Sequence, residues 1–374
     1  MSNVKISVII PCHNTEKYLS DCLKSLEKQT LGIENLQVIL VNDASEDGTW
    51  QIISDFEKRH PRETIAINLE KNMMQGAARN IALQYVEGKY VRFLDSDDCF
   101  QENSCKLLYE LAEERDLDLI CFECLSFRDE DGFTDNEVLE LSIRQIYDFS
   151  DRETRSSFLL SDEIGYNHWK KFYRTSLLQR SGATFYEGAT VFEEAKFVFP
   201  QYLHTRNAAV VDNRLTYNRI RHGSASKASA ITNTNRVMCN AEAQKSLLDF
   251  LKEDHSIFEL YKNEIIDFFF WHFYYETCEF ALRYQQFMKY EEYDWMRTVV
   301  LEELSDDNGC MFVNCNPASV FFIDCMKKCL VKTNIDVILW CGYVNVIMTL
   351  VLKNGGYVNE GVKSLMQEVV SKLS

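Results

Sequence analysis

The chain has 374 residues, of which 46% are hydrophobic, so it is long enough to bury a sizeable core in about two to three domains. Its formal net charge of −17 argues against nucleic acid as a partner, because binding a phosphate backbone requires a basic surface. With only 4 prolines and 14 glycines, long disordered linkers are not expected.

Two hydrophobic periods alternate along residues 4–125. Short apolar runs predict buried strands at Ile6–Ile10, Leu36–Val41, Thr64–Leu69, Tyr90–Leu94 and Leu117–Leu125. The segments between them predict helices at Glu16–Gln29, Thr49–Arg59, Gly76–Val86 and Glu102–Glu114. Repeated strand–helix–strand units favour an open α/β architecture with a mostly parallel sheet covered by helices on both faces.

The rest of the chain lacks this alternation. Residues 126–235 are mixed in pattern, and residues 236–374 are mostly helical, with an aromatic-dense stretch at Phe268–Tyr275 that favours a packed core. The apolar run Val337–Leu352 has polar interruptions and is shorter than the roughly 20 residues that cross a bilayer. It favours a buried helix, and an in-plane membrane contact stays open.

The first residues run directly into the first predicted strand without an apolar leader. The 13 cysteines are therefore interpreted as reduced thiols. We expect a cytoplasmic protein.

Polar side chains follow four predicted strands where each strand ends, at Pro11–Asn14, Asn42–Ser45, Glu70–Asn72 and Asp95–Asp97. In open α/β sheets, ligands bind outside the carboxyl ends of the parallel strands. The four strand ends together therefore predict a ligand site at one edge of the sheet.

Asp95 and Asp97 are carboxylates separated by one residue at a strand end. Both can bind one Mg²⁺ or Mn²⁺ ion, and the ion can neutralise a bound diphosphate. The alternative is a solvated turn in which Asp98 or Ser96 caps the next helix.

Residues near the other strand ends suit a nucleotide. Gly76 lets backbone approach a ligand, and Arg79 offers a forked donor to phosphate or to a base carbonyl. Asp43 can accept the imide proton of a pyrimidine, and His13 offers a face for stacking. The alternative for Arg79 is an ordinary helix start with an ion pair to a surface acid.

Four segments together resemble the N-terminal half of a family 2 glycosyltransferase with the GT-A fold: SVIIPCHNTEKYLSDCLKSLEKQT, VILVNDASEDGTWQII, NMMQGAARNIAL and YVRFLDSDD. Two later segments, WKKFYRTSLLQRSGATFYEGATVFEEAKF and LTYNRIRHGSAS, are similar to its acceptor-side motifs. The resemblance implies a GT-A domain at residues 1–230. Its nucleotide-sugar-binding half would be 1–125 and its acceptor-side half 126–230, before a helical region at 231–374.

The resemblance also implies a nucleotide diphosphate sugar donor, usually a uridine diphosphate (UDP) sugar. The implied donor-binding residues are Pro11, His13, Glu16, Asp43, Gly76, Arg79, Asp95, Ser96, Asp97 and Arg221. The implied metal ligands for Mn²⁺ or Mg²⁺ are Asp97, Asp95 and His222. Two positions depart from the family pattern: His13 replaces a more usual Tyr, and Met74 stands where Gly is common.

The family's catalytic base is usually the Asp of a Glu-Asp pair, and the matching residues here are Glu193 and Glu194. Glu194 can take the proton of an acceptor hydroxyl, although its extra methylene moves the carboxylate. The alternative is a charged first helical turn favoured by the helix dipole. The implied acceptor-side residues are Trp169, Lys170, Arg174 and Glu193, while Arg219, Arg221 and His222 either close over the diphosphate or form a basic surface turn.

The sequence is therefore interpreted as a metal-dependent, inverting glycosyltransferase, a hexosyl- or N-acetylhexosaminyl-transferase. By analogy it acts in surface polysaccharide synthesis on a glycan or lipid-linked glycan, at the inner face of the membrane. One alternative is a catalytically degenerate nucleotide-sugar-binding module. Another is a nucleotidyltransferase, which would carry a Gly-rich loop after the first strand. A dinucleotide oxidoreductase is disfavoured, because no GxGxxG follows that strand.

Overall fold

The computed structural model describes residues 4–373 except 129–137, 162–164, 188–191, 221–235, 284–287, 304–330, 333–335, 338, 345–346 and 348–359. The chain forms two compact units, Met1–Ser224 and Ala225–Ser374. The expected functional boundary at residue 230 lies outside the described residues and stays a prediction.

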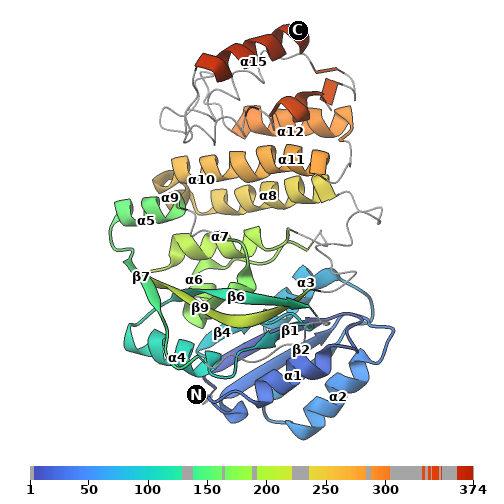
Figure 1. Cartoon of the computed structure of the whole chain (residues 1–374), viewed down its shortest axis with the longest axis vertical. Coiled ribbons are helices and arrows are strands. Elements are labelled where there is room, and N and C mark those ends of the chain that lie inside the picture. Colours follow the sequence, from blue (N-terminus) through green and yellow to red (C-terminus); the bar gives the residue numbers. More distant parts are fainter. Residues whose placement is uncertain are drawn as a thin grey trace. The chain divides into compact units, whose positions relative to one another are not determined.

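The described residues of the first unit form a nine-stranded sheet of order β3-β2-β1-β4-β8-β6-β9-β5, with β7 paired to β9 (Figure 1). Its first part is parallel and consists of β1 (Ile6–Cys12), β2 (Leu36–Asn42), β3 (Thr64–Asn68) and β4 (Tyr90–Phe93). The connecting helices are α1 (Leu19–Glu27), α2 (Thr49–Arg59) and α3 (Met74–Leu83). The predicted strand–helix alternation is confirmed here.

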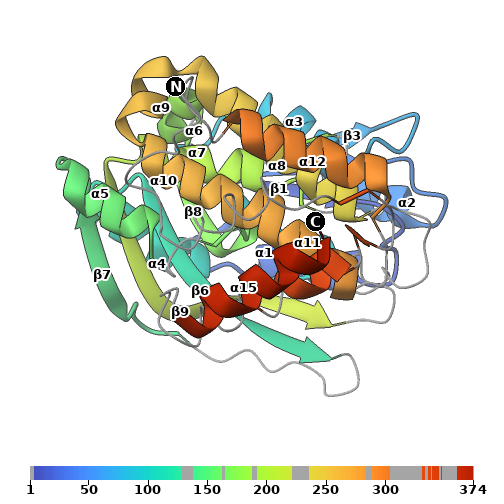
Figure 2. The same cartoon turned by 90° about the horizontal axis from the view of Figure 1, so that it is seen from above.

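The rest of the sheet is mixed. It contains β5 (Cys99–Phe100), β6 (Leu119–Arg128), β7 (Ile143–Asp148), β8 (Lys171–Arg174) and β9 (Asn207–Ile220). The predicted strand near 117–125 is present as β6, but β8 takes the place beside β4 and runs antiparallel to both β4 and β6. The long strands β6 and β9 then pair in parallel, side by side in Figures 1 and 2.

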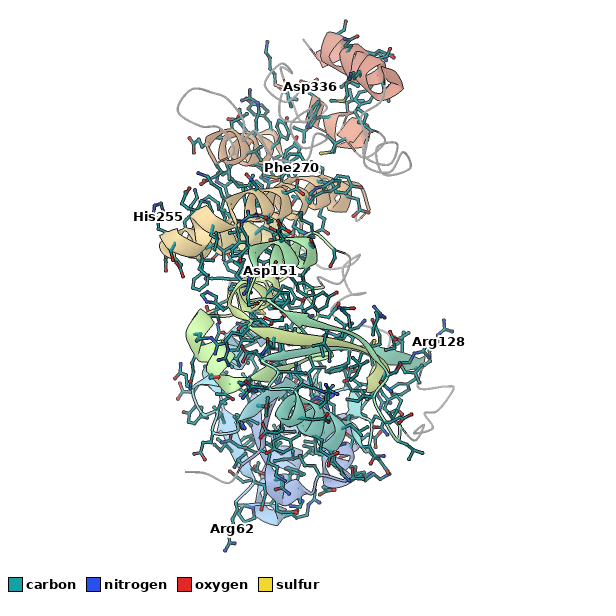
Figure 3. The ribbon with its side chains drawn as sticks, turned by 90° about the vertical axis from the view of Figure 1, so that its left-hand side faces the viewer. Arg62, Arg128, Asp151, His255, Phe270 and Asp336 are labelled. Carbon is teal, nitrogen blue, oxygen red and sulfur yellow. The ribbon has the colours of Figure 1, made fainter. Side chains whose placement is uncertain are left out.

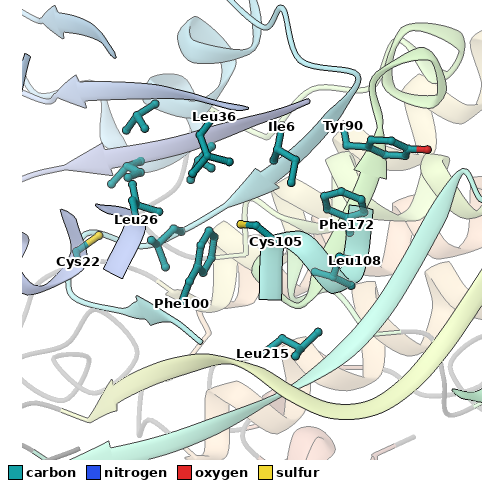
Figure 4. Close-up of a cluster of buried hydrophobic side chains, with 14 of the residues drawn as sticks. Ile6, Cys22, Leu26, Leu36, Tyr90, Phe100, Cys105, Leu108, Phe172 and Leu215 are labelled. Carbon is teal, nitrogen blue, oxygen red and sulfur yellow. The ribbon is translucent and has the colours of Figure 1, made fainter. Parts of the chain in front are cut away.

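Helices cover both faces of this sheet. A buried cluster joins one face to α1, α2 and α4 (Ser104–Glu114), with Leu26 and Leu108 packed near Ile6 and Phe172 (Figure 4). On the other face Phe93 packs edge-on against Phe197 of α7. The remaining helices of this unit are α5 (Arg152–Leu159), α6 (Thr175–Ser181) and α7 (Ala195–His204). Burial on both sides explains why the parallel strands are apolar along their length.

The second unit is helical in its described residues, as predicted. Its elements are α8 (Arg236–Glu253), α9 (His255–Leu260), α10 (Lys262–Phe269), the π-helical segment η5 (Phe270–Tyr275), α11 (Glu276–Arg283), α12 (Tyr290–Glu303) and α15 (Glu360–Leu373). The predicted packing role of the aromatic stretch is confirmed, because Phe270 (Figure 3), Phe273 and Tyr274 are buried.

The described part of the run Val337–Leu352 is helical, and Val337, Trp340, Val344 and Ile347 are buried at helical spacing. This agrees with the predicted buried helix. None of the helices in the described ranges combines the length and the apolar character needed to span a bilayer.

Candidate active site

The carboxyl ends of β1, β2 and β4 meet at one edge of the sheet. Cys12 at the end of β1 lies opposite Asn42 at the end of β2, and Ile9 lies opposite Phe93, two residues before Asp95. This register brings His13, Asp43, Asp95 and Asp97 to the same edge, which we call the donor edge. Pro11 is half-buried within β1, opposite Val41.

The imidazole of His13 is held at both nitrogens. Nδ1 lies 2.6 Å from the backbone carbonyl oxygen of Asp43, which can only accept, so Nδ1 carries the proton. Nε2 then accepts from Nδ2 of Asn72 at 3.1 Å and from Nδ2 of Asn14 at 3.2 Å. The exposed ring is fixed in orientation, as a stacking surface requires.

The carboxylate of Asp43 is buried and half used. Its Oδ1 accepts the backbone N–H of Met73 at 2.6 Å, and Oδ2 has no hydrogen-bond partner among the described residues. The next residue, Met74, has φ = 70°, the left-handed region that glycine adopts without strain. The loop therefore keeps a glycine-like backbone at the position where the sequence has methionine.

Glu16 connects the loops after β1 and β2. Its Oε2 accepts the backbone N–H of Gly48 at 2.7 Å, and its own N–H donates to Asp47 Oδ2 at 3.1 Å. The structure thus gives Glu16 a role in ordering the donor edge. Direct donor contact by Glu16 stays a prediction.

Arg79 is buried in the middle of α3, with 1% of its side chain exposed. Nη2 donates to Asp95 Oδ1 at 2.8 Å, Nη1 donates to Glu193 Oε1 at 2.7 Å, and Nε has no hydrogen-bond partner among the described residues. The alternative of a surface ion pair is therefore wrong. Arg79 therefore links Asp95, just after β4, to Glu193, which is 114 residues after Arg79 in the chain.

Gly76 is one turn before Arg79 and packs against protein. A Cβ built there would lie 2.4 Å from the carbonyl oxygen of Tyr186 and 3.2 Å from Cβ of Glu193. The structural reason for glycine is thus close approach to the segment that carries Glu193. Its contact with a donor stays a prediction.

The three aspartates after β4 have different environments. Asp95 and Asp97 are partly exposed, whereas Asp98 and Ser96 are buried. Asp98 accepts the backbone N–H of Arg219 at 2.8 Å and Nδ2 of Asn218 at 3.2 Å. Burial, with the charges of Asp95 and Asp97, raises the pKa of Asp98 well above its ordinary value. Burial and the neighbouring negative charges therefore disfavour an ionised Asp98, and the hydrogen bonds from β9 partly offset this effect.

Two alternatives that the sequence left open for this segment are wrong: a helix cap at Ser96 or Asp98, and a basic surface turn at Arg219. Closure of Arg219 over a diphosphate stays a prediction. Neither Ser96 nor Asp98 caps the following helix, because α4 begins at Ser104 with Asn103 at its N-cap. Arg219 donates from Nε to the backbone oxygen of Asp97 at 2.9 Å, and its side chain is 9% exposed. Its guanidinium holds the aspartate turn in place.

Asp95 and Asp97 carry the hard oxygen ligands that Mg²⁺ and Mn²⁺ prefer, at alternate positions after β4. One oxygen of Asp95 is already paired with Arg79, and a cation bound to these two residues stays a prediction. Among the residues that the structure describes, no group of three His, Cys, Asp or Glu side chains forms a ready metal site. His222 and Arg221 lie outside the described residues.

Glu193 and Glu194 precede α7 and serve different partners. Glu193 is buried against Arg79. Glu194 is 25% exposed at the N-cap position of α7, and its side chain does not cap the helix. Its Oε1 lies 3.1 Å from Nδ1 of buried His168. Phe192 just before them has φ = 69°, a strained backbone for a bulky residue.

Burial shifts the acidity of both glutamates. The pKa of Glu193 is raised to about 7 by burial and by Glu194, which together outweigh Arg79. The pKa of Glu194 is raised to about 7 by burial, with Arg79 and Lys171 opposing and Asp95 reinforcing the rise. A base with a pKa near 7 is matched to proton transfer at neutral pH. We call Arg79, His168, Glu193 and Glu194 the base cluster.

The other acceptor-side candidates divide into two groups. Trp169 and Lys170 lie in the turn before β8, and this turn contacts the end of β4. Lys170 Nζ donates to Glu123 Oε2 at 3.0 Å. Arg174 lies at the far end of β8, opposite Tyr90 at the start of β4, where it pairs with Asp116 at 2.7 Å. The structure does not bring Arg174 to the site, because β8 runs antiparallel to β4.

Sequence reasoning missed His168 and the backbone N–H of Met73, and it placed Asn72 at a strand end without giving it a role. His168 directly precedes the segment WKKFYR, and only that proximity could have indicated it. The roles of Asn72 and Met73 depend on the loop conformation, which has no sequence signature.

Residues 7–179 match the model of glycosyl transferase family 2. This segment belongs to that family. Glycosyltransferase GlyA of Streptococcus pneumoniae serotype 4 is 29% identical over 232 residues, which are 60% of this chain and 32% of GlyA. The poly(ribitol-phosphate) beta-N-acetylglucosaminyltransferase TarS of Staphylococcus aureus is 27% identical over 226 residues, 57% of this chain and 35% of TarS. The chain thus covers about a third of each relative.

The crystal structure of S. aureus TarS 1-349 in complex with UDP superposes with a TM-score of 0.59 at 22% sequence identity. The match covers 95% of this chain and 93% of that one. The predicted GT-A fold with a helical C-terminal extension is confirmed.

Proposed function

We propose that this protein is a metal-dependent, inverting glycosyltransferase that moves a sugar from a nucleotide diphosphate sugar, a UDP-sugar by preference, to an acceptor hydroxyl. The observation that carries the proposal is the chain of ion pairs Asp95–Arg79–Glu193, which joins the neighbour of Glu194 to the donor edge. The family 2 segment and the fold shared with a UDP complex of TarS support it.

On this proposal the donor edge binds the nucleotide. The fixed ring of His13 stacks on the base, and Asp43 Oδ2 accepts its imide proton. Asp95 and Asp97 would hold Mn²⁺ or Mg²⁺, which supplies charge neutralisation at the departing diphosphate. Buried Arg79 holds Asp95 in place and separates its charge from that of Glu193.

Glu194 would act as the general base. The acceptor oxygen attacks the anomeric carbon while its proton passes to Glu194, and the bond from that carbon to the diphosphate oxygen breaks. A single displacement inverts the anomeric configuration. Glu194 suits this role because its carboxylate is partly exposed, whereas Glu193 is enclosed with Arg79.

The setting is part of the proposal. GlyA is named a glycosyltransferase and TarS a poly(ribitol-phosphate) beta-N-acetylglucosaminyltransferase. These names support a hexosyl- or N-acetylhexosaminyl-transferase. By analogy we propose that it builds surface polysaccharide on a glycan or lipid-linked glycan, in the cytoplasm or at the inner membrane face.

A thermal-shift panel of nucleotide diphosphates and nucleotide sugars, with and without Mn²⁺, tests donor binding. We expect stabilisation by UDP ligands that depends on Mn²⁺ and is lost in Asp97→Ala. Asp116→Ala is a matched control, because that carboxylate is exposed and pairs with Arg174 away from the site. Equal shifts in wild type and Asp97→Ala would contradict the assigned site. Binding without turnover of any donor would favour the degenerate module.

A further inference from the structure

Glu194 is held by a side chain that no motif indicates. Nδ1 of His168 lies 3.1 Å from Glu194 Oε1. His168 is 1% exposed while a quarter of the Glu194 side chain is exposed, so one carboxylate oxygen is fixed from the interior and the group still faces outward.

The direction of this hydrogen bond follows from burial. Nε2 of His168 is buried and has no hydrogen-bond partner among the described residues. A proton on Nε2 would leave an unsatisfied buried donor, which is costly. Burial, and then the charge of Arg79, lower the pKa of His168 well below its ordinary value, so the ring is neutral. The single proton is therefore on Nδ1, and Nδ1–H donates to Glu194.

The ring of His168 is also fixed in position. Phe93 and Phe185 each contact it edge-on with centroids 5.1 Å away. The preceding turn is tied down by Lys171, whose Nζ donates to the carbonyl oxygens of Gly165 at 2.7 Å and Asn167 at 3.0 Å. An imidazole N–H that is fixed in this way can hold a carboxylate at the geometry that proton transfer requires.

We propose that His168 is a positioning residue for the general base: its Nδ1–H aims and stabilises the ionised carboxylate of Glu194. This inference rests on the proposed glycosyl transfer. It explains how two adjacent glutamates differ, because Glu193 bonds Arg79 and Glu194 bonds a neutral donor. A neutral N–H favours the ionised carboxylate of Glu194. A fixed cation would bind that carboxylate more tightly than a neutral N–H does.

Two variants separate the hydrogen bond of His168 from its packing. His168→Phe keeps an aromatic ring between Phe93 and Phe185 but removes the N–H that donates to Glu194. His168→Asn keeps an N–H near the Nδ1 position but loses the ring. His60→Phe is a matched control, because His60 Nε2 forms a similar contact of 2.9 Å with Glu27 outside the site.

The kinetic test is the pH profile of donor turnover by the full chain with Mn²⁺. In His168→Phe we expect the acid limb to move up by about one pH unit and kcat to fall roughly ten- to a hundredfold, with the donor KM unchanged. In His168→Asn and His60→Phe we expect the limb to stay in place. Other charged groups facing Glu194 are Arg79, Lys171, Asp95 and Glu193, and all are unchanged in these variants.

A second readout does not depend on turnover. NMR of ¹⁵N-histidine and ¹³C-glutamate labelled protein should show His168 as the neutral Nδ1–H tautomer, perturbed by Glu194→Gln, and a Glu194 titration that moves to higher pH in His168→Phe. An unmoved titration, or an Nε2–H tautomer, would overturn the inference. If His168→Phe does not fold, the tautomer in wild type and Glu194→Gln decides. Absence of turnover in wild type would reject the proposed function, while the NMR result still decides the role of His168.

Discussion

The donor edge and the base cluster are adjacent but are built differently. At the donor edge, His13 and Asp43 follow their strands directly and bond to nearby loop backbone. In the base cluster, Arg79, His168 and Glu193 come from segments far apart and are buried. On the proposed function, we therefore expect donor recognition to depend on local loop geometry and base chemistry to depend on the tertiary burial of charge.

The largest stability effect should come from Arg79→Met, which removes the cation shared by Asp95 and Glu193. We expect the free energy of unfolding to fall by about 3–5 kcal/mol, because a buried carboxylate loses its partner. Urea denaturation measures it. The control Arg59→Met removes an exposed ion pair with Glu27 and should cost below about 1 kcal/mol. Equal losses of unfolding free energy in Arg79→Met and Arg59→Met would contradict a larger role for the buried ion pairs.

The free energy of unfolding should also depend on pH through the two glutamates of the base cluster. Glu193 and Glu194 have pKa values raised to about 7, above the value of 4.5 expected when unfolded. The folded state therefore binds more protons between these values, and the stability that the pair contributes below pH 4.5 is lost as pH rises through about 7. Activity should rise over the same range, because the base must be ionised.

Denaturant titration at pH 5.5 and 8 measures how much of this loss of unfolding free energy is due to Glu193. Relative to Glu193→Gln, wild type should lose roughly 2–3 kcal/mol more between these pH values. If the pH dependence of both proteins is the same, Glu193 does not carry a raised pKa.

Gly76→Ala tests the contact between α3 and the segment bearing Glu193. Its Cβ would meet the carbonyl oxygen of Tyr186 at 2.4 Å, so we expect a loss of about 1–3 kcal/mol in thermal or urea unfolding. Gly165→Ala is the control, because the nearest atom there is 3.9 Å away. An unchanged stability of Gly76→Ala would contradict the close contact between Gly76 and the carbonyl oxygen of Tyr186.

The smallest effect is expected at the donor edge. Met74→Gly relieves a residue at φ = 70° and should stabilise the protein by up to about 1 kcal/mol. Neighbouring Met73 has φ = −109°, so Met73→Gly gains nothing and should be neutral or destabilising. Melting temperatures compare the two, and a lower value for Met74→Gly would contradict the strain.

The parallel part of the fold could be predicted because its signals are local. Apolar runs in β1 and β2 specify strands buried on both faces, and the polar residues that follow them specify the donor edge. The insertion of β8 beside β4 could not be predicted, since strand order depends on long-range pairing. For the same reason Arg174 was assigned to the wrong end of the sheet.

The base cluster was only half predictable. Glu193, Glu194 and Arg79 are visible in motifs, but the ion pair that joins them and the contact of His168 arise from folding. The positive φ of Phe192 likewise has no sequence signature, because bulky residues rarely adopt it.

The most direct measurement is product formation from a UDP-sugar by wild type and Glu194→Gln at saturating donor and Mn²⁺, with donor affinity measured in parallel. General-base catalysis predicts that the rate falls about 10²- to 10⁴-fold while donor affinity is unchanged, because Glu194 lies beside the donor edge and outside it. A Glu194→Gln enzyme that transfers sugar at the wild-type rate would contradict the account.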